Sequence, residues 1–216
     1  MLSTLKTEAG FEIVANKIKE MKMPVSNSSL AFSIKEKDLF PEGMDYDPVE
    51  KVFYIGSIHK GKVIKVNKKG ETSDFIKAGQ DGLLPTIGLR VDEKRRHLWI
   101  VSSFGRKNTS IAQNLFGTSG LFKYDLKTGK LIKKYMLPQE EGHFLNDLVV
   151  NNNGDVYVTD SYKPAVYKIA AENDRIEKFI ELEGFPNGIE FTPDQSKLFV
   201  ASQGVYLVDI KTKKQN

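Results

Sequence analysis

The sequence has no cysteine and no long hydrophobic run. Without cysteine, neither a disulfide bond nor a cysteine-ligated metal site is possible, and the redox compartment stays open. No apolar stretch approaches the roughly 18 residues of a membrane-spanning helix. Residues 1–20 also lack the apolar core of a secretory signal peptide. We therefore expect no membrane partner. The expected compartment is cytoplasmic for the sequence as written, and periplasmic or secreted if a leader precedes it.

Arginine is scarce: 5 arginines stand beside 27 lysines in a chain of net charge +4. The lysines are scattered over predicted turns and outward strand positions, such as Lys62, Lys65, Lys68 and Lys69. Surfaces that bind nucleic acids usually gather basic residues on one face and read bases with arginine. Scattered lysines are more typical of solvated strands that resist edge-to-edge association. The charge pattern therefore predicts no nucleic-acid partner, and it leaves the oligomeric state undetermined.

The sequence does contain a repeat, seen most clearly in residues 143–161. This stretch holds a polar pair, a short apolar strand, an Asn-Gly turn at 153–154 and a second strand. Asn-Gly between two β-rich runs is typical of a hairpin, because such turns need positive φ. The pattern occurs four times, and its corresponding positions are Glu42, Ile87, Asn146 and Asn187. A period of roughly forty to fifty residues, lengthened once by an insertion at 104–120, indicates a β-propeller or a similar array.

Each repeat continues into a third strand, and the first three continue into a fourth, which is the make-up of a propeller blade. We therefore predict an all-β fold: a β-propeller of four-stranded blades over residues 30–216. Residues 1–29 are predicted to be an N-terminal extension, partly irregular or a short helix. Residues 30–39 alternate like a strand, and we expect them to complete a last blade that follows residue 216. The fourth repeat stops before its outer strand, so we expect the chain to be cut short.

The corresponding positions of the repeats predict a metal site. The starts of these strands converge on the central channel of a propeller, so Glu42, Asn146 and Asn187 would become neighbours there. Ca²⁺ prefers about six to eight oxygen ligands from carboxylates, amides and water, whereas Zn²⁺ prefers histidine or cysteine. Taken singly, Glu42 reads as a loop carboxylate and the asparagines as turn residues. Ile87 interrupts the series, and it either packs beside the site or faces a ligand.

Other catalytic motifs are weak. The sequence has neither the G-x-S-x-G pattern of serine hydrolases nor a phosphate-binding glycine loop. His143 lies three residues before Asn146. It is either a base at the mouth of the channel or a surface residue of the loop.

Three segments resemble the SMP-30/gluconolactonase/LRE-like family: PEG at 41–43, LND at 145–147 and PNGIEFTPDQSKLFVAS at 186–202. The resemblance implies a six-bladed propeller with a divalent ion in its channel, of which about four blades are present. By similarity, Glu42 matches the family's first-blade metal glutamate, and Asn187 matches the metal asparagine of its PNG motif. Asn146 matches the asparagine of an Asn-Asp pair beside the metal and the substrate.

The sequence departs from the family pattern in two ways. The family's last metal ligand, an aspartate that also serves as catalytic base, would fall beyond residue 216. Phe144 stands where sugar-lactonase members have a substrate-binding arginine, which favours a more hydrophobic lactone or ester.

The resemblance therefore implies a divalent-metal-dependent hydrolase of a lactone or related ester, with Ca²⁺ as its cofactor. The base would be Asp147 or the aspartate beyond residue 216, with Phe144 and Ile87 at the substrate and Phe104 and Arg106 at the entrance. The alternatives are a non-catalytic propeller that binds a ligand or protein around a structural calcium ion, and an inactive fragment.

Overall fold

The computed structural model describes residues 6–22, 26–105 and 113–215, which fall into two units, Met1–Ser33 and Ile34–Asn216. The first unit contains the helix α1 (Phe11–Met21), which begins after Gly10, a residue with a φ of 88°. No residue of α1 is buried. Among the described residues, no helix is both long enough and apolar enough to cross a membrane.

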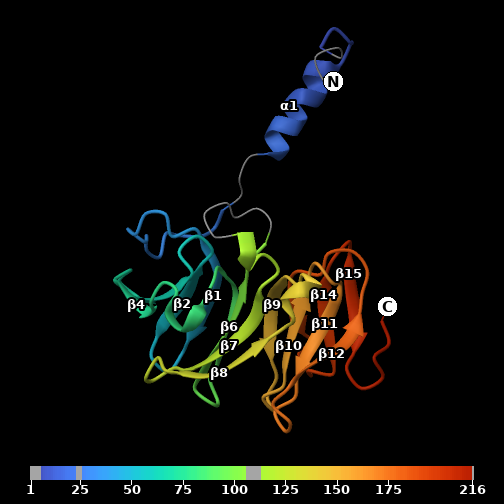
Figure 1. Cartoon of the computed structure of the whole chain (residues 1–216). Coiled ribbons are helices and arrows are strands. Elements are labelled where there is room, and N and C mark those ends of the chain that lie inside the picture. The colour runs from blue at the N-terminus through green and yellow to red at the C-terminus, as the bar shows by residue number, and fades with distance from the viewer. Residues whose placement is uncertain (1–5, 23–25, 106–112, 216) are drawn as a thin grey trace. The chain divides into compact units, whose positions relative to one another are not determined.

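The second unit consists of four antiparallel sheets, each a blade of a propeller (Figure 1). Blade 1 contains β1 (Pro41–Asp47), β2 (Val52–Ser57), β3 (Lys62–Asn67) and β4 (Thr72–Ile76), and blade 2 contains β5 (Thr86–Asp92), β6 (His97–Ser103), β7 (Ser119–Asp125) and β8 (Leu131–Met136). Blade 3 contains β9 (Leu145–Val150), β10 (Val156–Asp160), β11 (Ala165–Ile169) and β12 (Ile176–Glu181), and blade 4 contains β13 (Ile189–Phe191), β14 (Lys197–Ala201) and β15 (Val205–Asp209). The predicted all-β propeller is thereby confirmed.

The blades are held together by apolar side chains packed between neighbouring sheets. Middle strands are buried on both faces, as the uninterrupted burial of β10 shows. Separate core clusters join blade 1 to blade 2, blade 2 to blade 3, and blade 3 to blade 4; Leu98, Leu145 and Leu198 are members of these three clusters respectively. A single blade cannot bury both of its faces, so stacking the repeats is what builds the core.

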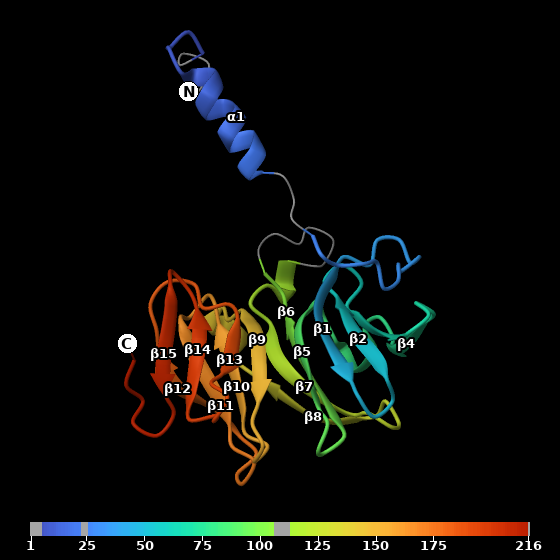
Figure 2. The ribbon, with the colours of Figure 1, turned by 180° about the vertical axis from the view of Figure 1, so that it is seen from behind.

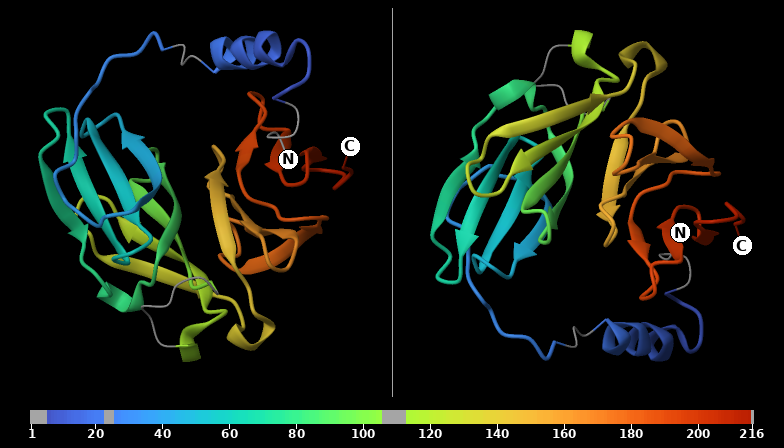
Figure 3. Two further views of the ribbon diagram at one scale, coloured as in Figure 1. Left: turned by 90° about the horizontal axis from the view of Figure 1, so that it is seen from above. Right: turned by 90° about the horizontal axis from the view of Figure 1, so that it is seen from below.

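The first strands of the blades lie side by side in the order β1, β5, β9 and β13, and the sheets follow one another around them (Figure 3). Glycine allows this close approach. A Cβ on Gly43 would lie 2.6 Å from the Ile87 carbonyl oxygen, and a Cβ on Gly88 would lie 2.6 Å from the Asn146 carbonyl oxygen. A side chain at either position would therefore push neighbouring blades apart.

We expect Gly88→Ala to lower the free energy of unfolding by about 2–3 kcal/mol, because backbone atoms cannot move aside as a flexible side chain can. Gly188 is the corresponding residue of blade 4, and the nearest atom that a Cβ there would meet is Ala201 Cβ at 4.0 Å. Gly188→Ala is therefore the matched control, expected within about 0.5 kcal/mol of the wild type. Urea denaturation of both variants measures the difference, and equal losses would contradict this account of how the blades pack.

An arginine joins blade 2 to blade 1 at the end of the strands away from these glycines. Arg96, in the β5–β6 turn, donates two hydrogen bonds to Asp47, at 2.7 and 2.6 Å. The Asp47 side chain is completely buried. The Arg96 guanidinium holds the pKa of the Asp47 carboxyl below its ordinary value. The neighbouring Arg95 reaches the other way and donates to the Asn152 carbonyl of blade 3 at 2.9 Å.

The strand predicted over residues 30–39 is wrong. None of these residues belongs to a sheet. The backbone has a positive φ at Asp38 (59°), inside this range, and at Phe40 (43°), directly after it, and both bend the chain. The segment is held by blade 1 instead: the Ile58 amide donates to the Phe40 carbonyl at 3.1 Å, and Lys60 Nζ donates to the Lys37 carbonyl at 2.9 Å. Alternation alone could not predict a strand here, because a strand also needs a ladder partner.

Candidate functional site

A cavity of about 250 Å³ opens where the first strands of the blades begin. It brings together residues from all four repeats, although they are up to 145 positions apart in sequence. It is lined by Glu42, Gly43, Met44, Ile87, Gly88, Leu89, Arg90, Asn146, Asp147 and Asn187. Five of the six site residues expected from the sequence therefore line one cavity, and Phe144 does not. Four of the five lie on β1, β5 and β9, and Asn187 lies just before β13; these strands are seen together in Figure 2.

Asn146 is a buried amide whose orientation is fixed by its neighbours. Its side chain is 6% exposed, and Nδ2 donates to Ser161 Oγ at 3.0 Å. Ser161 Oγ in turn donates to the Pro186 carbonyl at 2.5 Å, so it has to accept from the Asn146 amide group. This chain of bonds leaves Asn146 Oδ1 without a donor among the described residues. The amide oxygen is thus available to a ligand in the cavity.

Glu42 and Asn187 present more exposed oxygen atoms on fixed backbone. A bulge between Glu42 and Met44 in the β1–β2 ladder sets the position of the glutamate. The Asn187 amide donates to the Ala201 carbonyl at 2.8 Å, and its carbonyl accepts from Thr159 Oγ1 at 2.6 Å. Within the described part of the chain, neither side chain has a hydrogen-bonding partner. Both are therefore free to bind a ligand.

Asp147 is the half-buried acid of the cavity. Its Oδ1 accepts the Leu148 amide at 2.9 Å, and its Oδ2 accepts the Ile189 amide at 3.4 Å. Burial raises the pKa of the Asp147 carboxyl, while these amides and the charge of Arg90 oppose the rise. Oδ2 keeps most of its hydrogen-bonding capacity, because its one backbone contact is long.

Among the residues that the structure describes, Arg90 is the one cationic residue that lines this cavity. Its Nε donates to the Leu148 carbonyl at 3.1 Å, and its Nη2 pairs with Glu190 Oε2 at 3.3 Å. The side chain thus crosses from blade 2 to the first strands of blades 3 and 4. A place for Arg90 in the cavity was not predicted from the sequence, although Arg90 is the one charged residue between Thr86 and Val91 in β5.

The side chains of the cavity fit a hard divalent cation. They offer the carboxylates of Glu42 and Asp147 and the amide oxygens of Asn146 and Asn187, all donors of the kind that Ca²⁺ prefers. Neither histidine nor cysteine, the ligands that Zn²⁺ favours, is among the described residues that line the cavity. Calcium in such a site would complete its shell with water or substrate oxygens.

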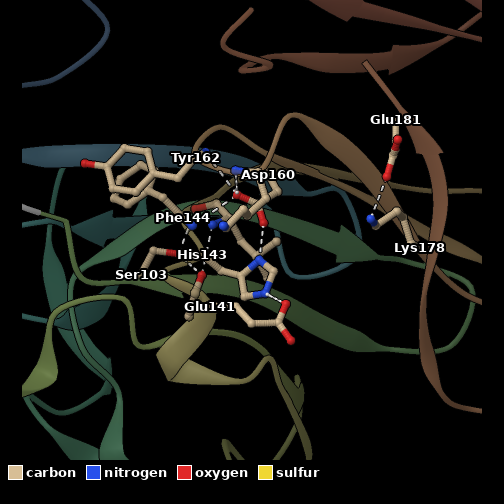
Figure 4. A network of polar contacts seen from close by, with 11 residues as sticks. Ser103, Glu141, His143, Phe144, Asp160, Tyr162, Lys178 and Glu181 are labelled. Atoms are coloured by element: carbon tan, nitrogen blue, oxygen red, sulfur yellow. Dashed lines mark hydrogen bonds and ion pairs between the residues drawn. The ribbon is translucent and has the colours of Figure 1, made fainter. Parts of the chain in front are cut away.

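His143 is buried, so the surface position considered for it is wrong. Its side chain is 2% exposed; Nδ1 contacts Asp160 Oδ2 at 2.5 Å, and Nε2 contacts Glu141 Oε2 at 3.0 Å (Figure 4). Asp160 also accepts the backbone amides of Phe144, Tyr162 and Lys163, each at 3.1 Å. This network fixes the loop that leads into β9. With both ring nitrogens paired, and outside the lining of the cavity, His143 is a structural residue.

Two serines fix the first residue of β9. Ser103 Oγ donates to the Leu145 carbonyl at 2.7 Å, and Ser119 Oγ accepts the Leu145 amide at 2.9 Å. The two hydroxyls are 2.6 Å apart, so Ser119 donates to Ser103. Ser103 ends β6 and Ser119 begins β7, so two strands of blade 2 hold the start of β9 in blade 3.

The aromatic residues expected near the substrate and the entrance, Phe144 and Phe104, are not among the residues that line the cavity. The Phe144 ring stacks on Tyr162 with centroids 5.0 Å apart. Phe104 is almost completely buried. Arg106, expected at the entrance, is outside the described residues.

The fold and the position of this cavity define the chain as part of a β-propeller with its candidate site in the central channel. The SMP-30/gluconolactonase/LRE-like region matches residues 40–214, and the chain belongs to this family. The resemblance seen in the PEG, LND and PNG segments is thereby confirmed. No curated protein sequence matches the chain.

Solved structures similar to the chain have diverse functions. A streptogramin B lyase is similar with a TM-score of 0.62 and 18% identity, over 86% of this chain and 56% of its own. A gluconolactonase from Xanthomonas campestris has a TM-score of 0.59 and 18% identity, over 82% of this chain and 60% of its own. A nidogen/laminin complex has a TM-score of 0.64 and 13% identity, over 81% of this chain and 61% of its own. The chain thus spans little more than half the length of these structures, and at such identities the likeness shows the fold alone.

Proposed function

We propose that the chain forms the main part of a divalent-metal-dependent hydrolase that acts on a lactone or a related ester. One observation carries the proposal: oxygen-bearing side chains from blades 1, 3 and 4 line a single cavity of about 250 Å³ in a member of a family that includes gluconolactonases. A cavity of this size accommodates a small cyclic ester beside a cation. The substrate class, the metal and the activity itself are all part of the proposal.

In this proposal, Glu42, Asn146 and Asn187 hold the cation, which we take to be Ca²⁺. When bound there, the cation polarises the ester carbonyl and stabilises negative charge on its oxygen. The bond from Asn146 Nδ2 to Ser161 keeps the Asn146 amide oxygen directed away from Ser161. This oxygen is therefore already oriented when the cation binds. Ile87, 5% exposed, supplies an apolar wall to the cavity.

Asp147 is the general base within this chain. It takes a proton from a water molecule at Oδ2, and the water attacks the ester carbonyl. The Leu148 amide, bonded to Oδ1, holds the carboxylate in place. The bond between the carbonyl carbon and the ring oxygen then breaks, and Asp147 returns the proton to the alkoxide oxygen that leaves, so the product is a hydroxy acid. Arg90 binds the Leu148 carbonyl and so supports the strand that carries Asp147.

We expect the chain to hydrolyse a simple aromatic lactone such as dihydrocoumarin, to lose this activity in EDTA, and to regain it with Ca²⁺. Asp147→Asn should reduce kcat about 100-fold, because general-base catalysis typically contributes a factor of 10²–10⁴. Its matched control is Asp38→Asn, the same change at an exposed aspartate outside the cavity, which should leave kcat unchanged. Turnover that persists in EDTA would contradict the metal dependence.

The same experiment distinguishes the alternative function. A binding module with a structural ion would show a higher melting temperature in Ca²⁺ but no turnover of any lactone or ester. That result would overturn the enzymatic proposal and keep the metal site. A chain that neither turns over lactones nor responds to Ca²⁺ would overturn both.

A further inference from the structure

Aromatic residues recur at one position of the repeat that the proposed chemistry does not use. Two residues before Glu42, Asn146 and Asn187, in blades 1, 3 and 4, stand Phe40, Phe144 and Phe185. Blade 2 has Pro85 at this position. The recurrence places a ring beside each proposed metal ligand, at the end of the strands where the cavity opens.

A second repeat position pairs with the first. Two residues after the second strand of the blade ends stand His59 in blade 1, where β2 ends at Ser57, and Tyr162 in blade 3, where β10 ends at Asp160. The Phe40 and His59 rings are 5.5 Å apart, and the Phe144 and Tyr162 rings are 5.0 Å apart. In blades 1 and 3, the loop before the first strand and the loop after the second strand therefore each bring an aromatic residue to the same place. We call the five residues the aromatic rim: Phe40, His59, Phe144, Tyr162 and Phe185.

On the side of blades 3 and 4, the rim is continuous. The Tyr162 ring lies 6.2 Å from Phe185 and 6.4 Å from Phe116, and it stacks on Phe144 (Figure 4). Gly105 lies close to the Phe144 ring, because a Cβ on Gly105 would lie 2.9 Å from it. Phe185 remains 48% exposed and Phe40 61% exposed. Large exposed rings at a repeated position beside a cavity are suited to holding an apolar ligand.

The rim is tied directly to the proposed metal ligands. Tyr162 follows Ser161, the residue that orients the Asn146 amide. Phe185 is held by the bond from its amide to Ser202 Oγ at 2.9 Å, two residues before Asn187. A group bound over the Tyr162 and Phe185 rings would therefore be close in the chain to the residues that hold a carbonyl in the cavity.

We propose that the aromatic rim binds the apolar part of the substrate, which makes Phe185 and Tyr162 specificity-determining residues for lactones with alkyl or aryl substituents. This inference rests on the proposed function and names its substrate class. A ligand gains about threefold to fourfold in affinity for each of its methylene groups that is buried against an apolar surface. A polyhydroxylated lactone would find no partners for its hydroxyls on the three phenylalanines of the rim, because phenylalanine rings neither donate nor accept conventional hydrogen bonds.

The test is a series of γ-lactones from γ-butyrolactone to γ-decalactone, assayed with the whole chain. We expect kcat/KM to rise about threefold for each added methylene until the rim is covered. Phe185→Ala should lower kcat/KM at least tenfold for γ-decalactone and less than twofold for γ-butyrolactone. Phe199→Ala on β14, a ring of similar exposure at 42%, is the matched control and should leave the series unchanged. Phe40→Ala removes the most exposed ring of the rim and should reduce γ-decalactone turnover about threefold.

Three results would overturn the inference: a flat series, equal losses on short and long lactones in both rim variants, and faster turnover of glucono-1,5-lactone than of γ-decalactone. Calorimetric titration with γ-decanolactam, a probe that is not hydrolysed, separates the rim from the chemistry. Binding of this lactam that is lost in Phe185→Ala, in a chain that hydrolyses no lactone, supports the rim and overturns the proposed function. Turnover of γ-butyrolactone with no effect of chain length overturns the rim and leaves the proposed function standing.

Discussion

Asn187→Ala is expected to weaken Ca²⁺ binding at least tenfold, measured by calorimetric titration of the chain. Asn187 lines the cavity with an exposed amide on a backbone held at both its amide and its carbonyl. Removing the Asn187 amide leaves the ion with one fewer of the six to eight oxygen ligands that Ca²⁺ prefers and makes the site less rigid. The fold should survive, because the side chain is exposed and packs against little.

A matched control for this prediction is Asn153→Ala. Asn153 is an exposed asparagine in the β9–β10 turn, at the other end of β9 from the cavity. Its replacement should change neither the affinity for Ca²⁺ nor the stoichiometry. An unchanged dissociation constant in Asn187→Ala, together with normal binding in the control, would remove Asn187 from the metal site.

Arg96→Ala is expected to lower the free energy of unfolding by about 3 kcal/mol at neutral pH, measured by urea denaturation. The substitution leaves the completely buried Asp47 carboxylate without its two hydrogen bonds from the guanidinium. The Val49 amide, which donates to Asp47 Oδ1 at 3.0 Å, is too weak a partner to replace them. Removing one member of a buried ion pair is costly because the other charge cannot return to water.

The pH dependence of this loss has a definite sign. The Arg96 guanidinium lowers the pKa of Asp47 below its ordinary value of 3.8, so the pair stabilises the fold above that pH and less as the pH falls through the lowered pKa. The difference between wild type and Arg96→Ala should therefore shrink in acid. Lys94→Ala, in the same turn, removes an exposed lysine with one long bond of 3.3 Å and should cost less than about 0.5 kcal/mol. A loss below about 1 kcal/mol in Arg96→Ala at neutral pH would contradict the role given to this pair.

The sequence predicted the propeller well because the repeat encodes it locally. Each blade has its own turn residues and its own β-branched and aromatic strands, and stacking identical units needs little further information. The strand predicted over residues 30–39 failed for the opposite reason. Its alternation of apolar and polar residues is a local signal, but a strand forms only where a neighbouring edge supplies hydrogen bonds, and blade 1 holds this segment by its turn and lysine side chains instead.

The candidate site could be predicted in part. Glu42, Asn146 and Asn187 came from comparing one position of the repeat, and the structure places all three around one cavity. Ser161 and Arg90 were missed because their roles depend on contacts between blades: Ser161 bridges Asn146 to the Pro186 carbonyl, and Arg90 reaches Leu148 and Glu190. Similarly, the burial of His143 depends on its contact with Asp160, which lies 17 residues away in the sequence.

The most direct test of the metal site is a crystal of the chain soaked in Mn²⁺, a hard cation whose anomalous scattering can be located. We expect one strong anomalous peak in the channel, with oxygens of Glu42, Asn146 and Asn187 each about 2.0–2.6 Å from it. A peak coordinated by other residues, or an empty channel in a fully soaked crystal, would contradict the claim that these three side chains form a metal site.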